Sequence, residues 1–178
     1  MGFEFLSRRR WLKLTLGAGG FLLMGGAGGL WALRGSAPHV RGLALLTDHE
    51  YRTLAALARA LFPPGGPIPV GASTMDLARA FDRFLADEPS WNQTDLRNAL
   101  FLLEYGPVIF ERRAVTFSHL SDAERLRHFE RWAESDDLMR RQVAVAFRKF
   151  LALVFYDRPE VWPHIGYDGP LIRREDPT

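Results

Sequence analysis

The chain has 178 residues, of which 25% are charged and 47% are apolar, and it contains no cysteine. The composition is that of one ordinary globular domain, which excludes a disordered or fibrous protein. Without cysteine, this chain can form no disulfide, iron–sulfur cluster, c-type haem attachment, cysteine zinc site or catalytic thiol. If the protein works in electron transfer, another chain must carry the redox centre.

The net positive charge of the chain comes from its N-terminal segment. Residues 1–37 hold five basic residues and one acid, a net charge of +4, which leaves 18 basic and 20 acidic residues in 38–178, a net charge of −2. The domain therefore lacks the basic excess that would neutralise phosphates, and we expect no nucleic acid among its partners.

The N-terminal segment has the pattern of a bacterial export signal. A basic stretch precedes twenty uncharged residues, 14–33, which end at Arg34. The stretch matches the twin-arginine pattern S-R-R-x-F-L-K, with tryptophan at the position where phenylalanine is usual. The predicted export-signal residues are Ser7, Arg8, Arg9, Trp11, Leu12 and Lys13. We therefore expect a periplasmic, membrane-associated protein.

Removal of this leader is a separate question. Small residues at 35–37 offer a cleavage site, but Pro38 follows it directly and should hinder cleavage. The uncharged run is also long enough to remain as a membrane anchor, which we favour slightly. The predicted organisation is a signal or anchor at 1–37, a linker at 38–46, a helical domain at 47–170 and a polar tail at 171–178.

Apolar residues at helical spacing predict the first three helices. Thr47 and Glu50 form a capping box, and the helix that follows ends at the proline- and glycine-rich loop that begins at Pro63. The second helix is expected to start with another capping box at residues 73–76 and to close at 87–89. The third is expected over 91–110, with Gly106-Pro107 kinking or interrupting it.

Two further helices complete the predicted domain. Ser121 and Glu124 form a third capping box before a helix that carries Phe129 and Trp132. The last helix, at about 137–156, is the most apolar, and we expect it to be the central one. Since no stretch alternates long enough for a strand, we predict an all-α, compact bundle of about five helices with a non-helical aromatic and proline-rich tail.

Candidate catalytic chemistry is sparse. Glu124 and His128 lie one helical turn apart and could share a metal ion, although a capping glutamate beside an exposed histidine explains them equally well. The acid pairs at 87–88 and 136–137 fall at predicted helix ends, where acids act as caps. No nucleophile motif is present. We predict no catalytic, cofactor-binding or metal-binding residues, and no enzymatic activity in this chain alone.

The tail and the proline loop are the predicted partner interface. Large aromatics on constrained, non-helical sequence make efficient interface anchors, although they could equally fold back over the bundle. The loop after the first helix is open to the same two interpretations, partner contact or ordinary connector. The predicted interface residues are Phe62, Pro63, Pro64, Trp162, Tyr167 and Pro170.

Several segments together resemble one known family. They are L-T-D-H-E at 46–50, L-F-P-P-G at 61–65, D-L-R-N-A-L-F-L-L-E-Y-G-P at 95–107, F-S-H-L-S-D-A-E-R at 117–125 and P-E-V-W-P-H-I-G-Y-D-G-P at 159–170. With the twin-arginine leader, this pattern is similar to the gluconate 2-dehydrogenase subunit 3 family. The resemblance covers nearly the whole chain, and the tail is its most specific element.

The resemblance implies a small, non-catalytic subunit of a membrane-associated periplasmic dehydrogenase that oxidises sugars, sugar acids or alcohols. The large partner in such complexes is a flavoprotein of the glucose-methanol-choline type, which binds the FAD and commonly lacks an export signal. A cytochrome c subunit often completes the complex. This chain would supply the signal to the twin-arginine translocase and escort the folded flavoprotein, in a chaperone-like role. The alternative is a free-standing, membrane-tethered periplasmic adaptor or small-ligand-binding domain.

Overall fold

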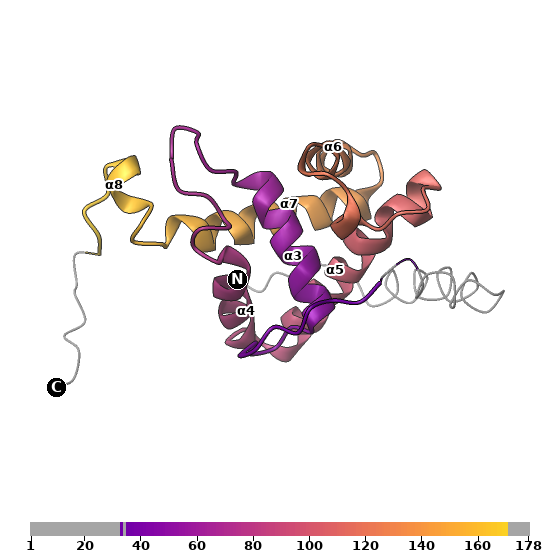
Figure 1. The fold of residues 1–178 in the computed structure, drawn as a ribbon, viewed down its shortest axis with the longest axis horizontal. Coiled ribbons are helices and arrows are strands. Elements are labelled where there is room, and N and C mark those ends of the chain that lie inside the picture. The colour runs from indigo at the N-terminus through magenta and orange to yellow at the C-terminus, as the bar shows by residue number, and fades with distance from the viewer. Residues whose placement is uncertain (1–32, 34, 171–178) are drawn as a thin grey trace.

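The computed structural model describes Leu33 and residues 35–170, so the predicted signal motif and the polar tail at 171–178 lie outside the described residues. The described part is helical, without strands, which confirms the all-α prediction. Within these described residues, five helices have ten or more residues, and two single turns accompany them (Figure 1). In chain order the elements are α3 (Asp48–Leu61), α4 (Leu77–Ala86), α5 (Ser90–Glu111), η2 (Phe117–His119), α6 (Asp122–Ala133), α7 (Leu138–Tyr156) and α8 (Trp162–Ile165).

Two of the three predicted capping boxes, at Thr47 and Ser121, are confirmed. The Thr47 hydroxyl accepts a hydrogen bond from the Glu50 amide at 3.3 Å, and the Glu50 carboxylate accepts one from the Thr47 amide at 2.8 Å. Ser121 and Glu124 repeat this reciprocal arrangement at the start of α6. Each box satisfies two backbone donors that the first helical turn leaves without partners, so these two helix starts are determined by residues three positions apart.

The start of α4 differs from the prediction. Residues 73–76 form turns, and the helix begins only at Leu77, after Asp76 in a left-handed conformation with φ of 45°. The Asp76 carboxylate accepts hydrogen bonds from the Arg79 amide and, at 2.6 Å, from the Tyr51 hydroxyl. These bonds compensate for the unfavourable backbone conformation, so Asp76 and not Ser73 or Thr74 caps the helix.

Of the two predicted effects of Gly106-Pro107, a kink or an interruption of the third helix, the interruption is wrong, because α5 continues from Ser90 to Glu111 through both residues. Gly106 is required there for a packing reason. A methyl group in place of its hydrogen would lie 2.6 Å from Cζ2 of Trp132 and 2.9 Å from Nε2 of His128. The glycine therefore lets the Trp132 and His128 side chains of α6 lie against the backbone of α5.

The central helix is α3 and not, as predicted, the last long helix. It packs against α4, α5, α6 and η2, and its Leu54 and Leu57 are fully buried. Alanines at several other buried positions of α3 let its neighbours approach from different sides. In contrast, α7 packs chiefly against α4 and α6 and leaves Val145 and Leu153 exposed. High apolar content thus did not determine which helix is enclosed.

The predicted linker is held against the bundle. Asp82 of α4 is fully buried, and its carboxylate accepts hydrogen bonds from the amides of Ala44, Leu45 and Leu46 at 2.6, 3.1 and 2.7 Å. Leu46 belongs to the hydrophobic core. Backbone donors from an irregular segment are thereby satisfied inside the domain, as burial of such groups requires.

Candidate partner interface

The tail after α7 is partly helical, which corrects the prediction that it has no helix. Val161 is fully buried, and the next four residues, Trp162–Ile165, form the single turn α8. Pro163 fits the first turn because its missing donor would have no intrahelical partner there. Gly166 adopts a left-handed conformation with φ of 68°, which ends the turn.

The rest of the tail folds around Trp162. Its indole nitrogen donates a hydrogen bond to the Tyr156 carbonyl at 3.0 Å, and its ring meets Tyr167 edge-on at 5.3 Å between centroids. Gly169 lies so close that an added methyl group would be 3.1 Å from the Trp162 ring. Tyr156, Ile165 and Tyr167 are each more than two-fifths exposed. We call residues 156–170 the aromatic tail; it is held by its own contacts and presents aromatic surface outward.

The proline loop is anchored at its base. Phe62 stacks on Phe155 of α7, with 4.4 Å between ring centroids, and its carbonyl accepts a hydrogen bond from the Ala72 amide at 2.9 Å. These contacts hold the loop closed while Pro63 and Pro64 remain exposed. We call residues 62–72 the proline loop.

The structure attaches both predicted interface segments to the same end of α7. Phe155 contacts the proline loop through Phe62, and the neighbouring Tyr156 carbonyl binds Trp162 of the aromatic tail. In Figure 1 both segments lie toward the left-hand end. Of the six predicted residues, two are half-buried (Phe62 and Trp162) and four are exposed (Pro63, Pro64, Tyr167 and Pro170).

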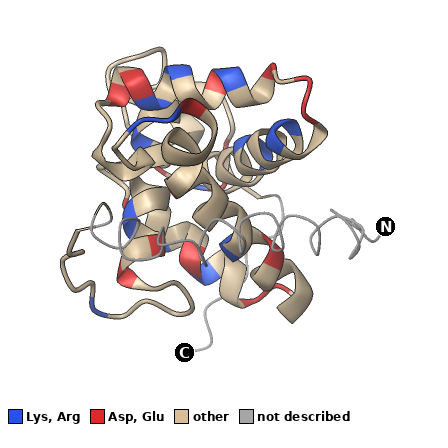
Figure 2. Cartoon of the chain, turned by 90° about the vertical axis from the view of Figure 1, so that its right-hand side faces the viewer, with Lys and Arg blue, Asp and Glu red and all other residues tan. Residues whose placement is uncertain are grey.

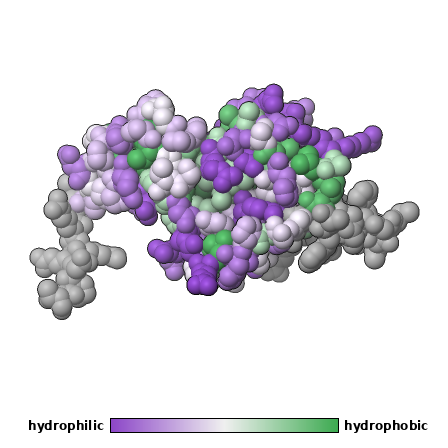
Figure 3. All heavy atoms as spheres, in the orientation of Figure 1, coloured by the Kyte–Doolittle hydropathy of each residue, from purple (hydrophilic) through white to green (hydrophobic). Residues whose placement is uncertain are grey.

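The surface around this end is amphipathic. Figure 3 shows the left-hand part mostly in pale tones, between hydrophilic and hydrophobic. Tyrosine, tryptophan and proline combine apolar area with polar or neutral character, so they can be exposed before assembly and buried after it. An open groove of about 340 Å³ adjoins the loop, lined by Arg59, Pro63, Pro64, Ser73, Asp122 and Leu126.

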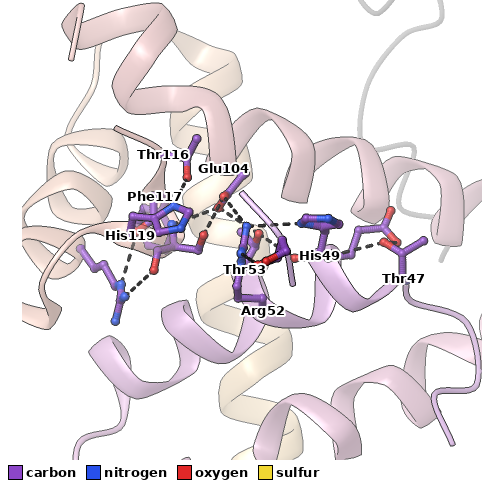
Figure 4. A network of polar contacts seen from close by, with 12 residues as sticks. Thr47, His49, Arg52, Thr53, Glu104, Thr116, Phe117 and His119 are labelled. Carbon is purple, nitrogen blue, oxygen red and sulfur yellow. Dashed lines mark hydrogen bonds and ion pairs between the residues drawn. The ribbon is translucent and has the colours of Figure 1, made fainter. Parts of the chain in front are cut away.

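A buried polar network, which the sequence patterns did not predict, surrounds Glu104 of α5 (Figure 4). The Glu104 side chain accepts hydrogen bonds from the Thr53 hydroxyl at 2.9 Å, the Ser118 amide at 3.0 Å and the Ser118 hydroxyl at 2.7 Å. Arg52 lies 3.8 Å from the same carboxylate. The one feature of the sequence that could have indicated this network is Glu104 itself, a single acidic residue within the apolar run 99–110.

Arg125 extends this network on the side of α6. Its guanidinium donates hydrogen bonds to the carbonyls of Phe117 and Ser118, at 3.3 and 2.6 Å, and pairs with Asp122. The network therefore joins α3, α5, η2 and α6. Because its carboxylate oxygens are already occupied by protein donors, the arrangement suits a structural role rather than acid–base chemistry.

His128 is a further buried titratable group. Its Nδ1 lies 2.5 Å from Oε1 of Glu111, and its ring packs against Phe117 and Trp132. Burial lowers the pKa of His128, against the opposing effect of Glu111. Glu124 instead binds Arg113, which lowers the pKa of this glutamate to about 2.

Glu124 and His128 thus contact different partners and do not converge on one point. Among the residues that the structure describes, no group of three or more histidine, aspartate or glutamate side chains is placed to hold a metal ion. Over the same described residues, no helix combines the length and the apolar character needed to cross a bilayer.

No protein-family model, curated protein sequence or solved structure matches this chain.

Proposed function

We propose that the chain is the non-catalytic small subunit and export escort of a periplasmic, membrane-associated, FAD-dependent dehydrogenase. The large subunit would bind FAD and oxidise a sugar, a sugar acid or an alcohol, and a cytochrome c subunit would accept its electrons where one is present. This chain would supply the twin-arginine signal and stabilise the folded flavoprotein.

The observation that carries this proposal is the aromatic tail at the end of α7. Aromatic side chains that are fixed by local contacts yet exposed lose little conformational entropy on binding, which is why such residues dominate interfaces. Trp162 is held by the Tyr156 carbonyl and by Tyr167, and Tyr167 itself is 46% exposed. The absence of cysteine from the sequence agrees with a redox centre in another chain.

The leader supports the escort role. Twin-arginine export carries proteins across the membrane already folded, so one signal can serve two chains that have assembled in the cytoplasm. Ser7, Arg8, Arg9, Trp11, Leu12 and Lys13 would then be read by the translocase on behalf of both chains.

The test is purification of the full chain, tagged at its C-terminus, from the membrane fraction of the native host. The proposal expects a larger chain to co-purify with bound flavin, seen in the absorbance spectrum and by mass spectrometry. It also expects the flavoprotein to remain cytoplasmic or to disappear when the gene for this chain is deleted. A lone, colourless chain, with normal export of flavoproteins in the deletion strain, would support the tethered adaptor instead.

A matched pair of tryptophan variants tests the tail. Trp162→Ala removes the centre of the aromatic tail and should reduce recovery of the flavoprotein by on the order of thirtyfold, the effect of losing one interface hot spot. Trp91→Ala removes a tryptophan that is 49% exposed on α5 and should leave recovery unchanged. Equal recovery with both variants would refute the assignment of the tail as the interface.

A further inference from the structure

The outer face of α7 differs in charge from the rest of the domain. The helix contains four basic residues and no acid, and these are Arg140, Arg141, Arg148 and Lys149. Figure 2 shows α7 nearly end-on with blue and no red, whereas α6 above it carries both colours. Acids occur only beside the helix ends, at Asp136, Asp137 and Asp157.

Apolar side chains are exposed among these charges. Seven residues of α7 are exposed, and at about 100° per residue they fall on one side of the helix, opposite the core; they are Leu138, Arg141, Val145, Arg148, Lys149, Leu153 and Tyr156. The face is about 27 Å long for 19 residues. It ends at Tyr156, whose carbonyl binds Trp162, so it is continuous with the aromatic tail.

The basic groups of this face lack acidic partners. Among the described residues, no carboxylate lies within ion-pair distance of Arg141, Arg148 or Lys149. Arg141 donates to the Ser135 carbonyl, and Arg148 lies over the ring of Phe129 at 5.6 Å, so both side chains are positioned without neutralisation. A partner with carboxylates could therefore gain their attraction without displacing an existing ion pair.

We propose that the outer face of α7 binds an acidic protein surface of the flavoprotein subunit. This inference rests on the proposed function and adds a second contact region, with a defined charge, to the aromatic tail. The exposed apolar residues would supply packing, and the basic residues between them would set the register against acidic residues of the partner.

Other occupants fit the face less well. A second copy of the chain would bring like charges together, and so would the leader, which carries Arg8, Arg9, Arg10 and Lys13. Insertion into a bilayer surface needs a separate apolar side along the helix. Here Val145 lies one turn from both Arg141 and Lys149, so the two kinds of side chain alternate.

The experiment places a photo-crosslinking amino acid at Val145 of the full, tagged chain in its native host, with a matched position at Asn98 on α5. The crosslinked peptide is then identified by mass spectrometry. The proposal expects crosslinking from position 145, but not from 98, to a segment of the flavoprotein that is rich in aspartate and glutamate.

Charge reversal supplies the second readout. The triple variant Arg141→Glu, Arg148→Glu, Lys149→Glu should lower the crosslink yield by on the order of tenfold or more, because like charges would then oppose each other. A control variant with the same change in net charge, Arg41→Glu, Arg112→Glu, Arg127→Glu, should keep the yield. Circular dichroism of both variants verifies that the helical fold is retained.

The outcomes separate the two proposals. Crosslinking to an acidic segment of a protein without flavin, lost on reversal, would support the binding face and refute the flavoprotein function. Recovery of the flavoprotein without crosslinking at 145 would refute the face alone. Crosslinking to another copy of this chain, binding of the purified chain to phosphatidylglycerol vesicles through these residues, or no crosslink at all would also refute it.

Discussion

Removal of the Glu104 carboxylate should destabilise the domain strongly. In Glu104→Ala, the buried Ser118 loses the acceptor for both its amide and its hydroxyl. Thr53 is affected less, because its hydroxyl also donates to the His49 carbonyl at 3.1 Å. A buried donor left without a partner costs about 1–3 kcal/mol. Two such donors, with the space left by the side chain, give an expected loss of about 3–5 kcal/mol in the free energy of unfolding.

The assay is urea unfolding of the full chain in mild detergent, followed by circular dichroism. With an m-value of about 2 kcal/mol per molar urea, the expected loss lowers the midpoint by about 2 M. Glu104→Gln keeps one acceptor oxygen and should lose about half as much. Glu130→Gln changes an exposed glutamate of α6 and should stay within about 0.5 kcal/mol of the unaltered chain.

A double-mutant cycle with Thr53→Val measures the coupling directly. Because the Thr53 hydroxyl and the Glu104 carboxylate share a hydrogen bond of 2.9 Å, the two changes should combine with a coupling of about 0.5–3 kcal/mol. A midpoint for Glu104→Ala no lower than that of Glu130→Gln would show that the network contributes nothing to stability. If the effects of Glu104→Ala and Thr53→Val simply add, the hydrogen bond between these two residues contributes nothing to stability.

Three further predictions concern other buried groups. Burial lowers the pKa of His128 below 6.5, so the unfolded chain binds more protons than the folded chain once the pH falls below 6.5, and the fold loses stability there. His128→Gln should flatten this part of the curve of stability against pH. An unchanged curve would show that His128 does not cause the loss. Gly106→Ala should lower the thermal midpoint because its methyl group meets Trp132 at 2.6 Å, whereas Gly66→Ala, with no atom within 4 Å, should not. In a spectroscopic titration of the folded chain, one tyrosine should ionise near pH 12 and be missing in Tyr51→Phe, since burial and the Asp76 carboxylate raise its pKa to about 12.

Local signals predicted much of the fold. The capping boxes at Thr47 and Ser121 depend on contacts across three residues, and the helices they start appear where the pattern placed them. Asp137 caps α7, as expected for an acid at a helix start. Such features are visible in sequence because both partners lie within one turn of the same helix.

Features that depend on distant contacts could not be predicted in this way. Asp76 caps α4 in a left-handed conformation because Tyr51, 25 residues earlier, binds its carboxylate. Glu104 and Thr53 are 51 residues apart. Gly106 of α5 lies against Trp132 and His128, which are 22 or more residues away in the sequence. In each case tertiary contacts overrode a local preference.

The arrangement of the domain bears on how an escort could serve two binding events at once. In Figure 1 the described chain, in indigo, begins toward the right, while α8 lies at the far left. Since the longest axis of the molecule is horizontal in this view, the start of the described chain and the aromatic tail are well separated. A folded partner bound to the aromatic tail would therefore leave the predicted leader accessible to the translocase. If the flavoprotein instead bound beside the leader, it would compete with the translocase for the same end of the domain.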